Sequence, residues 1–204
     1  MNPLLMRRRA VMNADRALPY DARVEYLGST NSRTQWIDTG IIPQSDDVIT
    51  IEYKDLNGTS SSYNRFFGVS SGPASRNLYL QTRNSKTFSC IGNTSSVDTL
   101  IDPIDTNWHV IQIDLANRKA TVDGGSPITV GTFSSTTYPL FLFGLNSSGS
   151  CINRPYIRVK RFSISDKLNL LPVRVGTVGY MYDTVSGHLF GNDGSGSFTV
   201  GQDI

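Results

Sequence analysis

The sequence predicts an all-β fold, namely a two-sheet antiparallel jelly-roll sandwich preceded by an extended N-terminal arm. The 204 residues include 18 Gly, 9 Pro, 9 Tyr and 9 Phe, a composition that favours strands and turns because aromatic side chains suit a pleated sheet. Alternating runs recur about every eight to twelve residues, which is the spacing of sandwiches. No internal repeat interrupts this pattern, so we expect one domain, residues 23–204, after an arm of residues 1–22.

The arm shows neither strict alternation nor a sustained helical stripe. It ends at Leu18-Pro19-Tyr20-Asp21, where the proline imposes an extended kink. Its apolar content is too high for a solvated coil, so we expect it to dock on another chain, either a neighbouring copy or a different protein. The residues expected to anchor it are Leu4, Leu5, Met6, Arg7, Arg8, Arg9, Val11, Met12 and Leu18.

The strands expected in the first half of the chain are short alternating runs bounded by turn residues. They cover residues 24–27, 35–41, 48–53, 65–69, 77–81 and 87–91. Asn57-Gly58 supplies a turn after the third strand. The last two strands alternate cleanly and are joined by a short polar loop, so they are expected to form an antiparallel hairpin.

The second half contains a second expected hairpin, with strands at 108–114 and 119–124 and an Asp-Gly pair at its end. Residues 139–145 are continuously apolar, which predicts a strand covered on both faces. Residues 156–164 return to alternation, with Arg158, Lys160 and Arg161 expected to face water.

Charge and hydropathy exclude several classes of function. Nineteen basic and seventeen acidic side chains give a net charge of +2, so nucleic acid is not an expected partner. An apolar run of about 18 residues, which a membrane span requires, is missing, so membrane insertion is not expected. The N-terminus has its apolar residues before its arginines, the reverse of a secretory signal. Cys90 and Cys151 in such a chain are expected to be reduced rather than paired.

The acidic residues do not predict a glycosidase. Such an enzyme needs two carboxylates that flank the scissile bond. The two glutamates of the chain, Glu25 and Glu52, are far apart in the sequence, and Pro103 interrupts the aspartates between 98 and 105. We therefore expect a protein without catalytic residues.

Metal and cofactor sites are not expected either. His109 and His188 are far apart, and the cysteines are isolated, whereas zinc sites usually have two such ligands at short spacing. Asp46-Asp47 could contribute to a calcium site with loop carbonyls, although paired surface acids are usually only solvated. The sequence thus predicts no cofactor and leaves calcium as an alternative.

Aromatic and basic residues near loops are the remaining candidates for binding. Sugar recognition uses flat rings beside amide, carboxylate or guanidinium groups. The candidate glycan-binding residues are Tyr63, Asn64, Arg65, Arg76 and Tyr79. The alternative is that these rings only fill the sandwich.

The central hairpin carries a resemblance to a known family. Trp108-His109, followed by Asp123-Gly124, resembles the laminin-G-like and pentraxin-like branch of the concanavalin A-like jelly rolls. Both ends of the domain, at 18–40 and at 171–201, resemble a narrower group of jelly-roll proteins common in gut bacteria of the Bacteroides kind and in their tailed phages. Many members of that group are phage structural proteins.

The resemblance implies a virion structural protein that is not an enzyme, such as a capsid decoration or fibre component at the virion surface. Its arm would bind other virion proteins or further copies in a homo-oligomer, and its jelly roll would be displayed for attachment to a surface glycan. The alternative is a free lectin-like module of a gut bacterium, and a degenerate glycosidase comes third. The apolar, Arg-rich arm favours the first interpretation, because a free lectin has no use for it.

Overall fold

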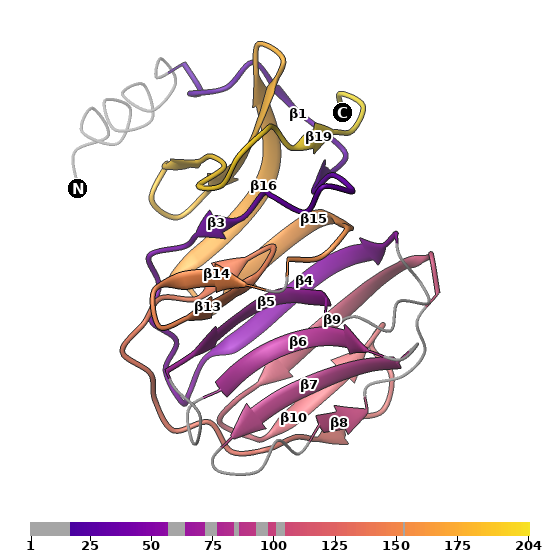
Figure 1. Cartoon of the computed structure of the whole chain (residues 1–204), viewed down its shortest axis with the longest axis vertical. Helices are drawn as coiled ribbons and strands as arrows, with labels where there is room; N and C mark the ends of the chain where they lie inside the picture. The colour runs from indigo at the N-terminus through magenta and orange to yellow at the C-terminus, as the bar shows by residue number, and fades with distance from the viewer. Residues whose placement is uncertain are drawn as a thin grey trace, which may run out of the picture.

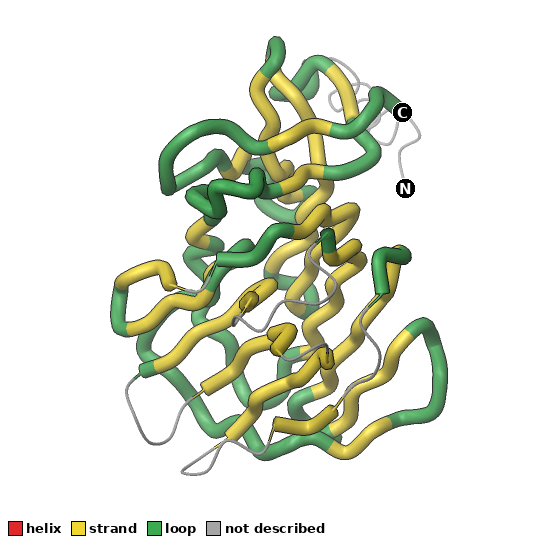
Figure 2. The backbone as a smooth tube through the Cα atoms, turned by 45° about the vertical axis from the view of Figure 1, so that its right-hand side comes forward, coloured by secondary structure: helices red, strands yellow, loops and turns green. Residues whose placement is uncertain are grey.

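The computed structural model describes residues 17–56, 64–71, 77–83, 86–92, 98–100, 105–152 and 154–204, with the backbone alone at 83, 86–92 and 98–100. Throughout these residues the regular structure consists of strands, without a helix. The strands form two sheets, which face each other as two layers in the lower part of the molecule (Figures 1 and 2). The pairing is mostly antiparallel, so the predicted all-β, two-sheet class is confirmed.

The larger sheet has the strand order β11-β10-β9-β4-β15-β16-β17-β18, with β1 added at β16 and β2 joining β15 to β19. Its long central strands cross the molecule, and β16 extends upward into the top part seen in Figure 1. The bounds are β1 Ala22–Arg23, β2 Leu27–Gly28, β4 Val48–Asp55, β9 Trp108–Asp114, β10 Lys119–Val122, β11 Ile128–Thr129, β15 Ile157–Ile164, β16 Leu168–Val175, β17 Val178–Asp183, β18 Leu189–Phe190 and β19 Thr199–Val200.

The smaller sheet has the order β14-β13-β5-β6-β7-β8, and β12 links β3 to β5. Its one parallel pair among the described strands joins β13 to β5. The bounds are β3 Ile37–Asp38, β5 Asn64–Ser70, β6 Asn77–Arg83, β7 Lys86–Gly92, β8 Asp98–Leu100, β12 Phe141–Leu142, β13 Leu145–Ser147 and β14 Ser150–Ile152.

The core lies between the two sheets and follows from strand alternation. In β4 every second residue is buried, which places Tyr53 against Phe66 of β5 with ring centroids 4.5 Å apart. Phe67 of β5 likewise packs on Phe162 of β15, with centroids 5.4 Å apart. Burial of each large apolar side chain contributes about 1.5 to 3 kcal/mol relative to exposure. These contacts hold the sheets together as a rigid base.

Both predicted hairpins are confirmed, while the expected strand at 139–145 is wrong. β6 pairs with β7 from Asn77 to Arg83, and β9 pairs with β10. The apolar run is divided into β12 and β13 because Phe143 adopts a left-handed backbone with φ 61°. Its amide donates a hydrogen bond to the carbonyl of Phe66. The turn redirects the chain along β5, so continuous apolarity here reflects burial rather than one strand.

The expected strands at 24–27 and 35–41 are also shorter than predicted, because these segments bridge other elements. β1 pairs with β16, and four residues later β2 pairs with β15 and β19. Directly before β3, the Trp36 amide donates a hydrogen bond to Asn192 Oδ1, which also accepts one from the Gly194 amide. A Cβ on Gly194 would lie 1.9 Å from the Thr34 carbonyl oxygen, so the Gly-rich loop docks against residues 34–38.

Candidate functional site

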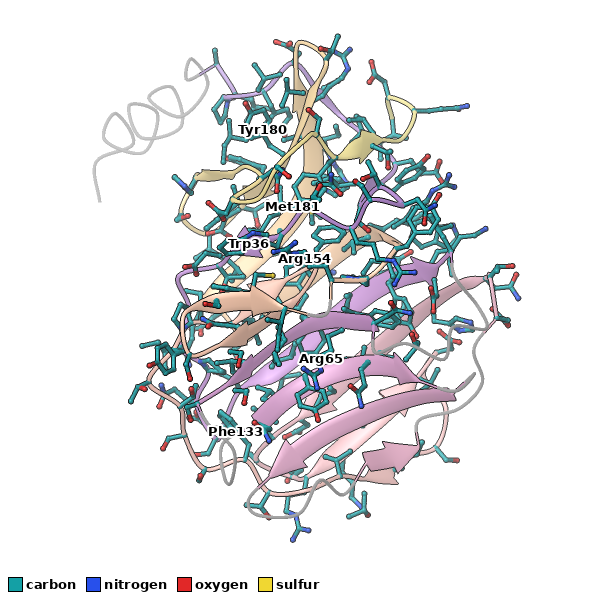
Figure 3. The ribbon with its side chains drawn as sticks, in the orientation of Figure 1. Trp36, Arg65, Phe133, Arg154, Tyr180 and Met181 are labelled. Carbon is teal, nitrogen blue, oxygen red and sulfur yellow. The ribbon has the colours of Figure 1, made fainter. Side chains whose placement is uncertain are left out.

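The predicted glycan-binding residues are only partly brought together. Arg65 of β5 and Tyr79 of β6 meet on the outer face of the smaller sheet, with the guanidinium carbon 4.4 Å from the ring centroid. Figure 3 shows Arg65 on this outward face. The Arg65 Nε also donates to Gln81 Oε1 at 3.2 Å. Tyr79 is only 7% exposed, so its ring offers little open surface to a sugar.

Asn64 is turned into the sandwich instead. Its side chain is fully buried, and its Oδ1 accepts a hydrogen bond from Arg33 at 2.9 Å. Tyr63 and Arg76 lie outside the described residues. The glycan-binding role of this group stays a prediction, with Arg65 and Tyr79 as its adjacent pair.

Of the predicted anchoring residues of the arm, Leu18 is described and is 59% exposed. The other eight lie outside the described residues. The chain joins its own sandwich from Tyr20 onward. The Tyr20 ring packs edge-on against Tyr182, and the Asp21 carboxylate accepts the Gly176 amide at 2.6 Å.

A second candidate site, which sequence reasoning missed, lies on the outer face of the larger sheet. β15 pairs with β4 along its length, but the register shifts between Val159 and Arg161. Lys160 is therefore the extra residue of a β-bulge. The buried and accessible positions of β15 then place Lys160 and Arg161 consecutively on the outer face. Bulges often re-aim side chains next to binding sites. Two adjacent basic residues inside an otherwise alternating strand were the available signal.

Two aromatic rings on this face are each covered by a cation of β15. The Arg158 guanidinium carbon lies 4.3 Å from the Tyr26 ring centroid, and Lys160 Nζ lies 4.2 Å from the Trp108 ring centroid. The two rings are 6.2 Å apart. Each cation–π contact contributes about 0.5 to 2 kcal/mol, depending on desolvation. The contacts fix the four side chains as one rigid platform.

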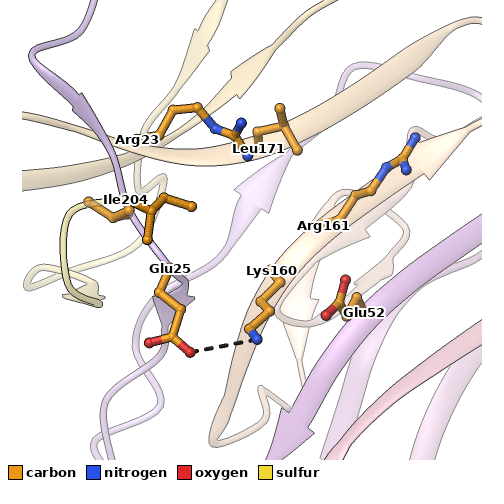
Figure 4. Close-up of a pocket in the computed structure, with 8 residues that line it drawn as sticks. Arg23, Glu25, Glu52, Lys160, Arg161, Leu171 and Ile204 are labelled. Atoms are coloured by element: carbon orange, nitrogen blue, oxygen red, sulfur yellow. Dashed lines mark ion pairs between the residues drawn. The ribbon is translucent and has the colours of Figure 1, made fainter.

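Next to the platform the surface is hollowed. β15 and β16 pair only at 162–164 and 168–170, and the chain from β1 to β2 crosses the gap between them. The resulting hollow has a volume of about 330 Å³ (Figure 4). It is lined by Arg23, Val24, Glu25, Glu52, Lys160, Arg161, Leu171 and Ile204. We call the platform and the hollow together the outer-face site.

The hollow holds both glutamates of the chain, although they are far apart in the sequence. Figure 4 shows Lys160 between Glu25 and Glu52, with Lys160 Nζ 3.6 Å from a Glu25 oxygen. Glu52 stands opposite Arg161 in the pairing of β4 with β15. Each carboxylate thus has a cation beside it. Separation along the chain was a poor guide, because the segment between β1 and β2 brings Glu25 next to β15, the strand that pairs with β4 and Glu52.

His109 forms a clamp on the opposite, inward-facing side of β9, where it stands across from the buried Tyr53 of β4. Its Nε2 lies 2.9 Å from Asp105 Oδ1 and its Nδ1 lies 2.8 Å from Asp123 Oδ2. Burial lowers the pKa of His109, but the hydrogen bonds to Asp123 and Asp105 outweigh it and raise that pKa above its usual value. The pKa of Asp105 is lowered, first by the Asn107 amide and then by His109. The clamp ties residue 105 to the hairpin of β9 and β10.

Of the two acids considered for calcium, Asp46 is exposed, whereas Asp47 serves a structural purpose. Asp47 is buried and accepts hydrogen bonds from the Gln44 amide and from Lys167 Nζ, both at 2.7 Å. No group of three His, Cys, Asp or Glu side chains within the described ranges is placed to hold a metal ion. Cys151 is a free thiol, and burial raises its pKa against the opposing effect of Arg154. The Cys90 side chain lies outside the described residues.

Comparisons with protein-family models and with curated proteins identify no relative of the chain. No protein-family model matches the chain, and no curated protein is similar to it at a significant level. The resemblance to concanavalin A-like jelly rolls therefore stays a prediction. Over the described part of the chain, no helix is long and apolar enough to cross a membrane.

Proposed function

We propose that the chain is a non-catalytic structural protein of a virion, a decoration or fibre component that binds surface glycans. In this proposal the sandwich is a concanavalin A-like jelly roll, attached to other virion proteins or to further copies through residues 1–22. Support comes from the sequence resemblance at both ends of the domain and from the apolar, Arg-rich composition of the arm. Neither feature suits an isolated enzyme.

The observation that carries the binding function is the outer-face site. Two aromatic rings, held by cations, lie beside a hollow with donors and acceptors on one rigid sheet. Saccharides are recognised by such a combination of flat apolar surface and convergent polar groups. The site is more accessible than the Arg65–Tyr79 pair, because Trp108 and Tyr26 are partly exposed whereas Tyr79 is buried. We therefore place the glycan on the larger sheet.

Glycoside hydrolysis is a second candidate, because Glu25 and Glu52 share the hollow. Two carboxyl groups flanking the bond are the minimum equipment of most glycosidases, and one of them must act as a general acid. Here Lys160 engages Glu25, and Arg161 is the strand neighbour of Glu52. Carboxylates with cations beside them are better suited to accept hydrogen bonds from sugar hydroxyls, so we favour binding without turnover.

A glycan array followed by calorimetry tests the proposed function. Trp108→Ala removes one ring of the platform, and we expect at least a tenfold loss of affinity because stacked area is lost. Tyr180→Ala, a half-buried ring at the top of the same sheet, is the matched control and should bind like the unaltered protein. Circular dichroism verifies that both variants are folded.

The same glycans, incubated with the protein and analysed by chromatography, should yield no product. Product formation that Glu52→Gln abolishes would replace the binding proposal with hydrolysis. Equal affinity of Trp108→Ala and the unaltered protein would remove the outer-face site from the proposal.

A further inference from the structure

We propose that the hollow of the outer-face site takes an acidic monosaccharide unit, such as a uronate or a sialate, within a longer glycan. This inference rests on the proposed function and names the ligand class of the same site. Three features carry it: the charge of the lining, the two cations without an ion-pair partner, and the mixture of acceptors and apolar wall.

The side chains of the lining carry three positive and two negative charges. Arg23, Lys160 and Arg161 face Glu25 and Glu52, and Arg158 adds a further cation on the neighbouring ring. A hollow whose side chains carry a net positive charge attracts an anion, and its partly enclosed walls strengthen this attraction. A neutral sugar would leave that charge without a counterpart.

Two of these cations remain for a ligand. Among the ion pairs of the described residues, Lys160 is engaged by Glu25, whereas neither Arg23 nor Arg161 takes part in one. Arg161 is held in place by a neutral hydrogen bond from its Nε to Asn169 Oδ1 at 3.0 Å. This bond orients the guanidinium and leaves both terminal nitrogens to bind a carboxylate, which an arginine fork does with good geometry.

The rest of the hollow suits a sugar ring rather than a simple anion. The carboxylates of Glu25 and Glu52 can accept hydrogen bonds from hydroxyl groups. Val24, Leu171 and Ile204 supply an apolar wall for the carbon face of the ring. The volume of about 330 Å³ lies at the lower end of the range of small-molecule sites, roughly 300 to 1,000 Å³, which fits one saccharide unit.

A polyphosphate or nucleic acid fits this site less well. Repeated phosphates would bring several negative charges to a face that also holds two carboxylates, and like charges at close range are unfavourable. A single carboxylate on a sugar that also carries hydroxyl groups uses both kinds of side chain. The site therefore favours an acidic saccharide over a uniform polyanion.

The test is calorimetry of the full chain with a panel of uronate- and sialate-containing oligosaccharides, each paired with its methyl ester. The ester keeps the shape and hydroxyl groups but removes the charge. We expect each bound acid to bind at least tenfold more tightly than its ester. Arg161→Gln should abolish this difference between acid and ester.

Arg118→Gln is the matched control, because Arg118 is an exposed arginine in the loop between β9 and β10 and outside the hollow. It should keep the preference for the acid. Equal binding of acids and esters, or an Arg161→Gln protein that keeps the preference, would overturn the inference and leave the proposed glycan binding intact.

Binding of only neutral glycans on the array would likewise overturn the inference alone. Absence of binding to every glycan would remove the proposed function together with it. Preferential binding of an oligonucleotide of equal charge would replace the saccharide with a polyanion.

Discussion

His109 shows how a single side chain can make the stability of this sandwich depend on pH. It bridges Asp105 and Asp123, and its pKa is raised in the folded protein. A histidine whose pKa is raised by folding stabilises the fold fully at a pH below its pKa in the unfolded chain, about 6.5. This contribution is lost as the pH rises through the pKa of the histidine in the folded protein. The pKa of each aspartate is lowered, so their contribution is lost only in acid.

We therefore predict that the melting temperature falls as pH rises above about 6.5, because His109 loses its proton and the stabilisation that depends on it. His109→Gln should flatten this dependence, because an amide does not titrate. His188→Gln is the matched control, since His188 is exposed and forms no ion pair within the described residues. Thermal denaturation at a series of pH values checks both variants. An unchanged slope in His109→Gln, or a flattened slope in His188→Gln, would contradict the assignment to the clamp.

At the scale of single elements, the bulge of β15 connects strand geometry with the candidate function. Strict alternation would place Arg158 and Lys160 on one face and Arg161 on the other. The extra residue resolves this conflict, because after Lys160 the pairing with β4 resumes at Arg161 opposite Glu52. The position of Lys160 over Trp108 and the position of Arg161 in the hollow both depend on this one-residue insertion.

Deletion of Lys160 should produce a regular strand and remove the function without unfolding the protein. The shortened run Val159-Arg161-Phe162 alternates inward, outward and inward, so the buried side chains keep their positions. We expect a cooperative thermal transition with a melting temperature within a few degrees of the original, and at least a tenfold loss of glycan affinity.

Lys160→Ala, which keeps the bulge, separates the geometry from the side chain. It should weaken glycan binding less than the deletion does, because Arg161 stays in the hollow. Loss of the cooperative transition in the deletion variant would show that the bulge is needed for folding rather than for the site.

At the scale of the whole molecule, local sequence patterns predicted those parts of the fold in which the paired strands are close in sequence. Alternation and turn residues predicted the hairpins of β6 with β7 and of β9 with β10, since both their partners are close in sequence. The buried turn at Phe143 was missed because its left-handed backbone depends on a hydrogen bond to Phe66, far away in the chain. Continuous apolarity reports burial but not direction.

The candidate site was missed for the same reason. The hollow is made by Arg23 and Glu25 from the start of the domain, Glu52 from β4 and Arg161 from β15, and no spacing within one segment connects them. The two ends of the domain lie together in the structure. β1 pairs with β16, β2 pairs with β19, and Val24 bridges to Asp203.

This joining of the ends determines where a truncation can separate the arm from the domain. Tyr20 packs on Tyr182, Asp21 accepts the Gly176 amide, and β1 pairs with Arg174 and Val173 of β16. These contacts belong to the sandwich, whereas Leu18 is exposed. A truncation that tests the arm should therefore keep residues 17–23.

We predict that removal of residues 1–16 leaves a folded domain that no longer enters particles, because the apolar and arginine side chains proposed to bind other virion proteins are gone. Its melting temperature should equal that of the full chain. Removal of residues 1–23 should in addition lower the melting temperature by several degrees, since a loss of about 1 kcal/mol shifts a domain of this size by roughly 2 to 4 °C. Denaturation scans and co-sedimentation with purified particles measure the two effects separately. Normal incorporation of the 1–16 truncation would contradict the anchoring role and leave the free lectin as the better interpretation of the outer-face site.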